Sequence, residues 1–322
     1  MIRLVPGYPI DTAEMRSVYV QALAEAGRQD PRIVSINCDL SRSIGTTDFT
    51  SEFPGRSINV GIQESNGMGV AAGLSVAGMI PFFHSFAVFS SRRVFDQAFI
   101  SCAYAGLNVK IIGADPGVSA TSNGGTHMAF EDMGLMRNIP TARVIDISDP
   151  VMLRGIVPEL VRHYGVDYLR LPRKKEHRIY EAGTPFVIGK ANLLREGSDV
   201  TILACGLLVH QALLAADQLA AEGIQARVAD LFTIKPIDRS FILESAARTG
   251  AFVTCENHSI INGLGSAVAE VLVENHPAPL ERVGINDEFG EIGDQEYLMR
   301  RFGLTADNIC ARARQAIGRK RA

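Results

Sequence analysis

One carboxyl group stands where a turn gives way to a helix of small residues. Glu64 follows the turn Gly-Ile-Gln at residues 61–63 and opens a predicted helix over residues 65–77, in which glycine and alanine recur. Small residues permit the close approach of another backbone. A glutamate that opens a helix is most often a favourable charge at the positive end of the helix dipole. Its use in catalysis therefore depends on the side chains around it.

Three aromatic side chains follow this helix at intervals of three residues. They are Phe83, Phe86 and Phe89, and the pair Asp96-Gln97 comes after them. Such a stripe, taken alone, is more often hydrophobic core than a binding surface. An aromatic face also suits a flat ring and excludes water from a reacting atom. Both interpretations stay open for Phe83 and Phe89.

A histidine in a glycine-rich loop is the second group that can handle protons. His127 ends the segment Gly-Gly-Thr-His at residues 124–127. Because imidazole changes its charge near neutral pH, a histidine in such a loop suits a proton shuttle. Taken alone, it would more often be a loop histidine with no part in chemistry.

Short runs rich in β-branched residues alternate with stretches of helical spacing, and these elements must position the groups above. This alternation predicts parallel sheets covered by helices on both faces. The expected fold class is α/β, with two three-layer α/β/α domains. Strands are predicted over residues 33–38, 109–114, 143–147, 166–171, 199–205, 224–231 and 251–256, and further helices over residues 211–222 and 266–274.

A charged, turn-rich stretch between Pro172 and Pro185 interrupts this pattern. No apolar period runs through it, which is typical of a linker. The length of 322 residues allows two cores of ordinary size, since domains cluster near ~100–150 residues. We therefore expect one domain over residues 1–180 and a second over residues 181–322.

Charge and cysteine content narrow the class of protein. A net charge of −3 gives no field that would recruit nucleic acid or an anionic membrane. No apolar run is long enough to cross a membrane, and residues 1–11 do not resemble a signal peptide. The five cysteines form no Cys-x-x-Cys pair. We expect a cytoplasmic protein whose partners are small molecules and other proteins.

The segment from residue 59 to residue 97 resembles the pyrimidine-binding domain of transketolases and deoxyxylulose-phosphate synthases. That pattern is a strand, Gly-Ile-x-Glu, a glycine-rich helix and a Phe-x-x-Phe stretch that ends in Asp-Gln. Residues 124–140 resemble the family's Gly-x-Thr-His-Gln segment and the helix after it, and residues 233–236 and 256–272 resemble its C-terminal domain. Residues 15–17 and a strand that ends in residues 39–41 resemble the opening of the same domain. These six motifs, in the family's order, extend over nearly the whole chain.

The resemblance implies thiamine diphosphate as the cofactor. It gives Glu64 a hydrogen bond to N1′ of the aminopyrimidine, which favours the reactive imino form of that ring. Phe86 matches the position beside the pyrimidine, and His127 matches a histidine that points at the substrate. The catalytic residues implied are Glu64 and His127, and the cofactor-binding residues implied are Glu64, Phe86, Phe83, Phe89, Asp39 and Ile62.

Three residues match the family's clamp for the phosphate of a sugar phosphate. They are Arg16, Ser43 and Arg173, and an arginine fork suits any tetrahedral oxyanion. Arg170 and Arg173 are equally open to interpretation as linker charges. The resemblance alone does not choose between these interpretations.

Two positions of the implied substrate site depart from the family pattern. Asp115 stands where ordinary transketolases carry a phosphate-binding histidine, and Asn123 stands where they carry an aspartate that reads a sugar hydroxyl. A carboxylate at the first position would repel a phosphate. Substrates other than a standard pentose phosphate therefore stay open, as does another route of anion binding.

The motif that holds the diphosphate of the cofactor is not found in this sequence. In the family it is Gly-Asp-Gly followed by an asparagine about thirty residues later, which together offer oxygen ligands to a divalent metal. The one Gly-Asp, at residues 293–294, continues into glutamine. We expect a separately encoded N-terminal subunit to bind the diphosphate and to supply the ligands of Mg²⁺ or Ca²⁺, in an α2β2 assembly. No metal ligand is expected in this chain.

The function implied is that of the C-terminal subunit of a thiamine-diphosphate-dependent transketolase, which transfers a two-carbon ketol unit from a ketose to an aldose. One alternative is the beta subunit of a 2-oxoacid dehydrogenase, which typically carries Gln-His-Ser-Gln where this chain has Gly-Thr-His-Met. A deoxyxylulose-phosphate synthase fragment is a further alternative, although that enzyme is normally one long chain. A non-catalytic paralogue with a binding or regulatory role is favoured by Asp115 and Asn123. Retention of Glu64, Phe86 and His127 argues against it.

Overall fold

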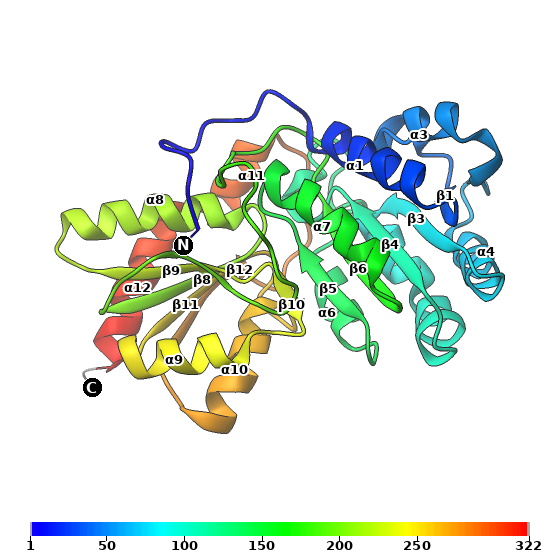
Figure 1. Cartoon of the computed structure of the whole chain (residues 1–322). Coiled ribbons are helices and arrows are strands. Elements are labelled where there is room, and N and C mark those ends of the chain that lie inside the picture. The colour runs from blue at the N-terminus through cyan, green and yellow to red at the C-terminus, as the bar shows by residue number, and fades with distance from the viewer. Residues whose placement is uncertain (1, 321–322) are drawn as a thin grey trace.

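Two β-sheets, each covered by helices on both faces, make up the computed structural model of the chain (Figure 1). The structure describes residues 2–320. The expected α/β fold is confirmed, although each sheet is mixed because one of its edge strands runs antiparallel. The central strands are buried on both sides because helices cover both of their faces. Among the described helices, none is long and apolar enough to cross a membrane.

The first sheet has seven strands in the order β10-β5-β6-β4-β3-β1-β2, and only β10 runs antiparallel to its neighbour. Four of these strands lie within one residue of the predicted ends. The strand β3 was not predicted, because its aromatic residues were interpreted as a stripe of side chains rather than as part of a strand. The bounds are β1 (Ile33–Asn37), β2 (Ser57–Asn59), β3 (Ile80–Phe86), β4 (Val109–Ala114), β5 (Arg143–Asp146), β6 (Val166–Leu171) and β10 (Thr233–Lys235).

Helices α1 and α7 pack together on one face of this sheet, and α4, α6 and η3 pack on the other. Small residues let α4 lie directly against the sheet: a Cβ atom at Gly67 would come 2.9 Å from the ring of Phe83 on β3. The bounds are α1 (Met15–Gln29), α2 (Ser41–Ile44), α3 (Thr47–Glu52), η1 (Pro54–Arg56), α4 (Glu64–Val76), α5 (Ala87–Ser91), η2 (Arg92–Val94), η3 (Gln97–Tyr104), η4 (Gly117–Ser119), α6 (Asp132–Arg137) and α7 (Pro150–Arg162).

The second sheet has five strands in the order β12-β11-β8-β9-β7, with β7 antiparallel to β9. Figure 1 shows α9 and α10 on one face of this sheet, with α8 and α12 on the other. The bounds are β7 (Asn192–Arg195), β8 (Val200–Ala204), α8 (Leu208–Ala221), β9 (Ala226–Asp230), α9 (Arg239–Thr249), β11 (Phe252–Ser259), α10 (Leu264–Asn275), β12 (Leu280–Ile285), α11 (Gln295–Arg301) and α12 (Ala306–Lys320).

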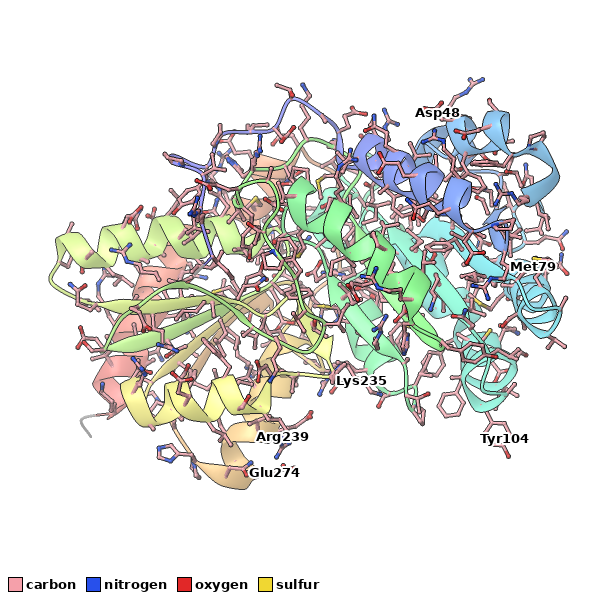
Figure 2. The ribbon with its side chains drawn as sticks, in the orientation of Figure 1. Asp48, Met79, Tyr104, Lys235, Arg239 and Glu274 are labelled. Carbon is pink, nitrogen blue, oxygen red and sulfur yellow. The ribbon has the colours of Figure 1, made fainter. Side chains whose placement is uncertain are left out.

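The strand β10 ties the two halves of the chain together. It follows β9 of the second sheet but pairs with β5 at the edge of the first. Lys235, labelled in Figure 2, donates from Nζ to the carbonyl oxygens of Arg137 and Ile139 at 2.8 and 2.6 Å. Both large clusters of buried apolar residues run from one sheet into the other. The halves therefore share both of these clusters.

A buried arginine also joins the two halves. Arg170 on β6 is fully buried and donates to Asp132 at 2.8 Å and to Asp146 at 2.9 Å. It also donates to the carbonyl oxygen of Asn257 on β11, at 2.8 Å. The interpretation of Arg170 as a linker charge is therefore wrong.

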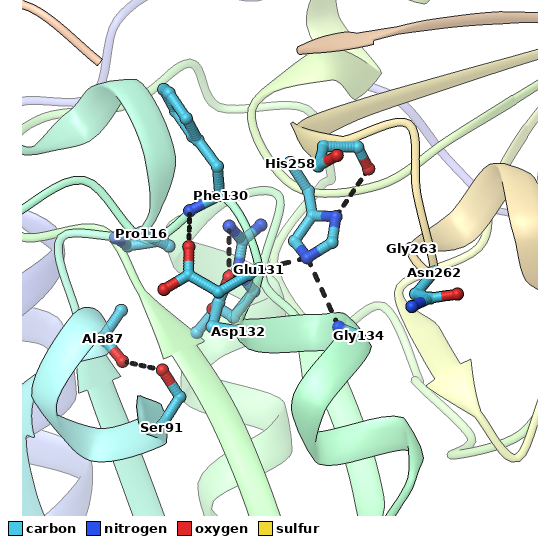
Figure 3. A network of polar contacts seen from close by, with 12 residues as sticks. Ala87, Ser91, Pro116, Phe130, Glu131, Asp132, Gly134, His258, Asn262 and Gly263 are labelled. Carbon is cyan, nitrogen blue, oxygen red and sulfur yellow. Dashed lines mark hydrogen bonds and ion pairs between the residues drawn. The ribbon is translucent and has the colours of Figure 1, made fainter. Parts of the chain in front are cut away.

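The same interface holds a buried histidine, shown in Figure 3. Nε2 of His258 lies 3.3 Å from the backbone nitrogen of Gly134 on α6, and its Nδ1 lies 3.7 Å from a carboxylate oxygen of Glu256. Burial lowers the pKa of His258 to about 4. Glu256 in turn accepts hydrogen bonds from the first backbone amides of α10, those of Leu264 and Gly265. These contacts support a structural part for both residues.

Candidate active site

The residues singled out in the sequence gather at the carboxyl edge of the first sheet. Asp39 lies just past the end of β1, Phe86 ends β3, Asp115 follows β4 and Arg173 follows β6. Parallel strands present their carboxyl ends at one edge, where open α/β sheets bind ligands. This edge is therefore the candidate active site.

Glu64 begins α4, and its side chain is 1% exposed. The hydroxyl of Ser85 on β3 donates to Oε1 at 3.0 Å, and Nη1 of Arg93 donates to Oε2 at 2.7 Å. The start of a helix also favours a carboxylate through the helix dipole. The carboxyl group is thus held between the strand β3 and the short segment η2.

Two phenylalanines and a histidine form an aromatic cluster beside this carboxyl group. Ring centroids of Phe86 and Phe89 lie 6.5 Å apart, and they lie 6.0 and 5.2 Å from that of His127. The hydroxyl of Thr126 is 2.9 Å from Nδ1 of His127. All three rings are half-buried. The structure therefore brings these three predicted residues together.

Arg93 connects the aromatic cluster with Glu64. Its Cζ atom lies 4.1 Å from the centroid of the Phe89 ring, within the range of a cation–π contact. Arg93 and Ser85 were not among the site residues predicted from the sequence. No spacing rule could have paired Arg93 with Glu64, because 29 residues and a strand separate them.

The remaining cofactor-binding residues implied by the resemblance occupy different surroundings. Phe83 is fully buried in the core beneath α4, since successive residues of β3 alternate between the two faces of the sheet. Ile62 is 71% exposed. Asp39 is exposed and has a positive φ of 60°, and its backbone amide donates to Oδ1 of Asn59. Asp39 and Ile62 are therefore exposed, whereas Phe83 lies in the interior.

The residues implied for the substrate also converge, with one exception. Arg16 and Arg173 both donate to the backbone carbonyl oxygen of Ser43, at 3.2 and 3.1 Å. Nε of Arg173 donates to Oδ2 of Asp115 at 2.7 Å, and its Cζ lies 5.0 Å from the centroid of the Phe86 ring. Asn123 instead lies exposed in the loop before His127. The arginine fork is therefore already paired within the chain.

Asp115 is held in an unusual setting. Its φ is +52° and its side chain is buried, while Oδ1 has no hydrogen-bond partner among the described residues. Burial, with a further contribution from the charge of Asp115, raises the pKa of Glu176 to about 7. The carboxyl groups of Asp115 and Glu176 thus lie close to each other. A buried and unpaired acceptor favours a hydrogen-bond donor as its neighbour.

A loop of the second domain covers the loop that carries His127. The backbone amide of Gly293 donates to the carbonyl oxygen of Thr121 at 3.3 Å. A Cβ atom at Gly125 would come 2.4 Å from the carbonyl oxygen of Gly290, so the two backbones touch. The sequence offered no signal for this contact, because the segments are more than 150 residues apart. The second domain therefore helps to position His127.

These residues fit the pyrimidine half of thiamine diphosphate. A buried carboxyl group can bond to a ring nitrogen, and the half-buried faces of Phe86 and Phe89 suit a flat ring. Burial and the nearby charge of Glu64 raise the pKa of Cys38 to about 12, which disfavours the thiolate form of this side chain. Across residues 2–320, no three His, Cys, Asp or Glu side chains converge in a way that would hold a metal ion.

Both domains match models of one protein family. Residues 11–177 match the model described as "Transketolase, pyrimidine binding domain". The chain belongs to the transketolase family. Residues 189–309 match the model described as "Transketolase, C-terminal domain". The resemblance found in the sequence is confirmed across both transketolase domains.

Several transketolase subunits are similar over nearly the whole chain. The 6-deoxy-6-sulfo-D-fructose transketolase subunit SqwH of Clostridium sp. (strain MSTE9) is 51% identical over 306 residues, which cover 95% of each chain. A subunit of the apulose-4-phosphate transketolase of Phocaeicola vulgatus is 36% identical over 299 residues, which cover 92% of this chain and 96% of that one.

A solved structure described as "Split gene transketolase, inactive beta4 tetramer" has the same fold. It is 44% identical, with a TM-score of 0.88, and the match covers 96% of this chain and 100% of that chain. The chain is therefore a transketolase-type subunit that resembles the C-terminal part of a split transketolase.

Proposed function

We propose that this chain is the C-terminal subunit of a thiamine-diphosphate-dependent transketolase that moves a two-carbon ketol unit from a ketose to an aldose. The observation that carries the proposal is the buried carboxyl group of Glu64 beside the cluster of Phe86, Phe89 and His127. A carboxyl group and aromatic faces are the contacts that an aminopyrimidine ring needs from a protein.

Each side chain of this set has a defined task in the proposal. Thiamine diphosphate, when bound, supplies a nucleophilic carbon that the protein itself lacks. Glu64 binds the pyrimidine at N1′ and exchanges a proton there, while the hydroxyl of Ser85 fixes the orientation of the carboxyl group. Phe86 and Phe89 contact the ring and exclude water. His127 exchanges a proton with an oxygen of the substrate, and Thr126 orients its imidazole.

The proposed partner is a separately encoded subunit that holds the diphosphate and Mg²⁺ or Ca²⁺. Two of the similar proteins are named as subunits, and a similar structure is described as a split-gene product in an inactive β4 form. We propose an α2β2 assembly for the active form of the present chain. Domains over residues 1–180 and 181–322 would both take part, because both large clusters of buried apolar residues run through the two of them.

The proposal is tested by ketol transfer with purified chain and partner. The first assay follows transfer from xylulose 5-phosphate to ribose 5-phosphate, with thiamine diphosphate and Mg²⁺, in the presence and absence of the partner. Turnover that needs both subunits and the cofactor supports the proposal. Release of carbon dioxide from pyruvate would indicate a 2-oxoacid dehydrogenase subunit instead, and a cofactor-binding complex with no turnover on any sugar would indicate a non-catalytic paralogue.

A matched pair of variants shows whether Glu64 is the group responsible. Glu64→Gln keeps the size of the side chain but cannot exchange the proton, so turnover should fall by about 10²-fold or more. Glu159→Gln changes a half-buried glutamate that, among residues 2–320, forms an ion pair with Arg162 away from the site, and it should leave turnover unchanged. Near-normal turnover by Glu64→Gln would exclude this assignment.

A further inference from the structure

Arg93 makes two contacts inside the proposed cofactor site. Its Nη1 donates to Oε2 of Glu64 at 2.7 Å, and its Cζ lies 4.1 Å from the centroid of the Phe89 ring. The backbone of Arg93 is also fixed, because the hydroxyl of Ser65 on α4 donates to its carbonyl oxygen at 2.8 Å. The guanidinium is therefore directed at Glu64 from a defined position.

We infer that the guanidinium of Arg93 occupies the place of the cofactor's pyrimidine and leaves it when the cofactor binds. A guanidinium is flat, donates hydrogen bonds to carboxylates and lies well on an aromatic face. An aminopyrimidine that binds Glu64 and contacts Phe89 needs the same two surfaces. This inference rests on the proposed function of Glu64.

The hydrogen-bond chemistry of Glu64 requires Arg93 to leave. Arginine has only donors, so the carboxylate oxygen that faces it must act as an acceptor. In the proposed reaction, the carboxyl group has to carry the proton that it exchanges with N1′. Oε1 already accepts from Ser85, which leaves Oε2 as the oxygen for the ring nitrogen. Arg93 and the pyrimidine therefore compete for one atom.

The surroundings of Arg93 explain why its guanidinium can stay on Glu64 when no cofactor is present and leave when the cofactor binds. A buried carboxylate without a partner is costly, so Arg93 stabilises Glu64 when no cofactor is present. The side chain of Arg93 is 44% exposed, whereas that of Glu64 is 1% exposed. After displacement, the guanidinium can turn into water without crossing the core.

The chain offers a matched control for Arg93. Arg92 is the preceding residue in η2, is 50% exposed and pairs with Glu131 at 2.8 Å rather than with Glu64. Arg93→Met removes the charge and its donors but keeps the length of the side chain, and Arg92→Met does the same one residue earlier. Arg93→Lys keeps a charge but loses the planar contact with Phe89.

The test measures thiamine diphosphate affinity by calorimetry in the complex of the chain with its diphosphate-binding partner. Arg93→Met should bind the cofactor about tenfold more tightly than the wild type, because no ion pair or cation–π contact is displaced. Arg92→Met should bind with unchanged affinity. An equal or weaker affinity of Arg93→Met would overturn the inference alone. A wild-type complex that binds no thiamine diphosphate would overturn both the inference and the proposed function.

A second measurement needs neither cofactor nor partner. Thermal midpoints of the chain alone are compared in a double-mutant cycle with Arg93→Met and Glu64→Gln. Arg93→Met should lower the midpoint in the presence of Glu64, and this effect should be much smaller in the Glu64→Gln background, where the contact with Phe89 is lost but no carboxylate is left without its partner. Equal effects in both backgrounds would show that Arg93 does not stabilise the carboxylate, which also contradicts the inference.

Discussion

The carboxylate of Asp115 lies on the guanidinium fork of Arg173, with Nε 2.7 Å from Oδ2. The resemblance to transketolases implies that Arg173 binds the phosphate of a sugar, yet in this chain the carboxylate of Asp115 already occupies its guanidinium. Nη1 of Arg173 donates to the carbonyl oxygen of Ser43 at 3.1 Å. The positive charge that an incoming phosphate would need is therefore largely neutralised before any substrate arrives.

Asp115→Asn should shift substrate preference toward phosphorylated sugars. The amide can still accept from Arg173 but carries no charge, so the guanidinium becomes available to an anion. We expect kcat/KM for a phosphorylated ketose to rise by about tenfold relative to that for an unphosphorylated ketose of the same chain length. Asp217→Asn, at an exposed pair with Arg195, is the control and should change neither value. A fall for both ketoses would show that Asp115 is needed for the fold of the site.

The place of Asp115 and Arg173 was open to sequence reasoning, but their pairing was not. Both follow strands of one parallel sheet, and alternation of strands and helices predicts that such residues share an edge. Which of them touch depends on strand order and loop shape, and 58 residues separate these two. The pair of Arg93 and Glu64 escaped prediction for the same reason.

Buried charge shows a second limit of sequence reasoning. Arg170 stands two residues before a charged linker, and its type alone favours exposure. It is buried because Asp132, Asp146 and the carbonyl oxygen of Asn257 converge on it from both domains. The strand β10 is a second example. It follows β9 of the second sheet in the chain but pairs with β5 of the first sheet, and its hydrophobic pattern does not distinguish it from a strand of the second sheet.

Arg170→Met should destabilise the chain strongly. It leaves two buried carboxyl groups without their charge partner, which costs on the order of 3–5 kcal/mol in the free energy of unfolding. Arg154→Met is the matched control, since its pair with Glu25 is about half exposed on both sides and is worth ~0–1 kcal/mol. Urea unfolding of both variants measures the difference. Equal effects would mean that the buried network is not a main link between the domains.

Gly125→Ala should disturb His127 without touching it. The new Cβ atom would lie 2.4 Å from the carbonyl oxygen of Gly290, so one of the two loops has to move. A displacement of about 1 Å at a catalytic group can lower turnover by ~10²-fold. Gly318→Ala lies on α12, where no atom of the described residues outside the backbone of that helix comes within 4 Å of the new Cβ atom, and it should keep full turnover. Normal turnover of Gly125→Ala in the ketol-transfer assay would show that the loop over residues 286–294 does not position His127.

His84 should make the chain sensitive to acid. It is fully buried on β3, where Nδ1 donates to the carbonyl oxygen of Ile36 at 3.0 Å and Nε2 accepts from the hydroxyl of Tyr19 at 2.7 Å. Burial lowers the pKa of His84 to about 4, although the contact with Ile36 opposes this shift. The folded state therefore holds a neutral imidazole where the unfolded chain, with an ordinary pKa near ~6.5, takes up a proton.

The sign of the effect follows from that difference. Between pH 6.5 and pH 4 the unfolded state binds more protons, so the stability contributed by a neutral His84 is present above pH ~6.5 and is lost as the pH falls. The side chain of His84→Gln cannot titrate. Over this pH range, the free energy of unfolding of the variant should therefore fall by on the order of 3 kcal/mol less than that of the wild type. Buried Glu256 and Asp230, whose pKa values burial raises to about 7, act in the opposite direction. They are present in both proteins, so their effect cancels in the comparison. Urea unfolding at several pH values measures both curves, and parallel curves would show that His84 is not the group that responds to acid.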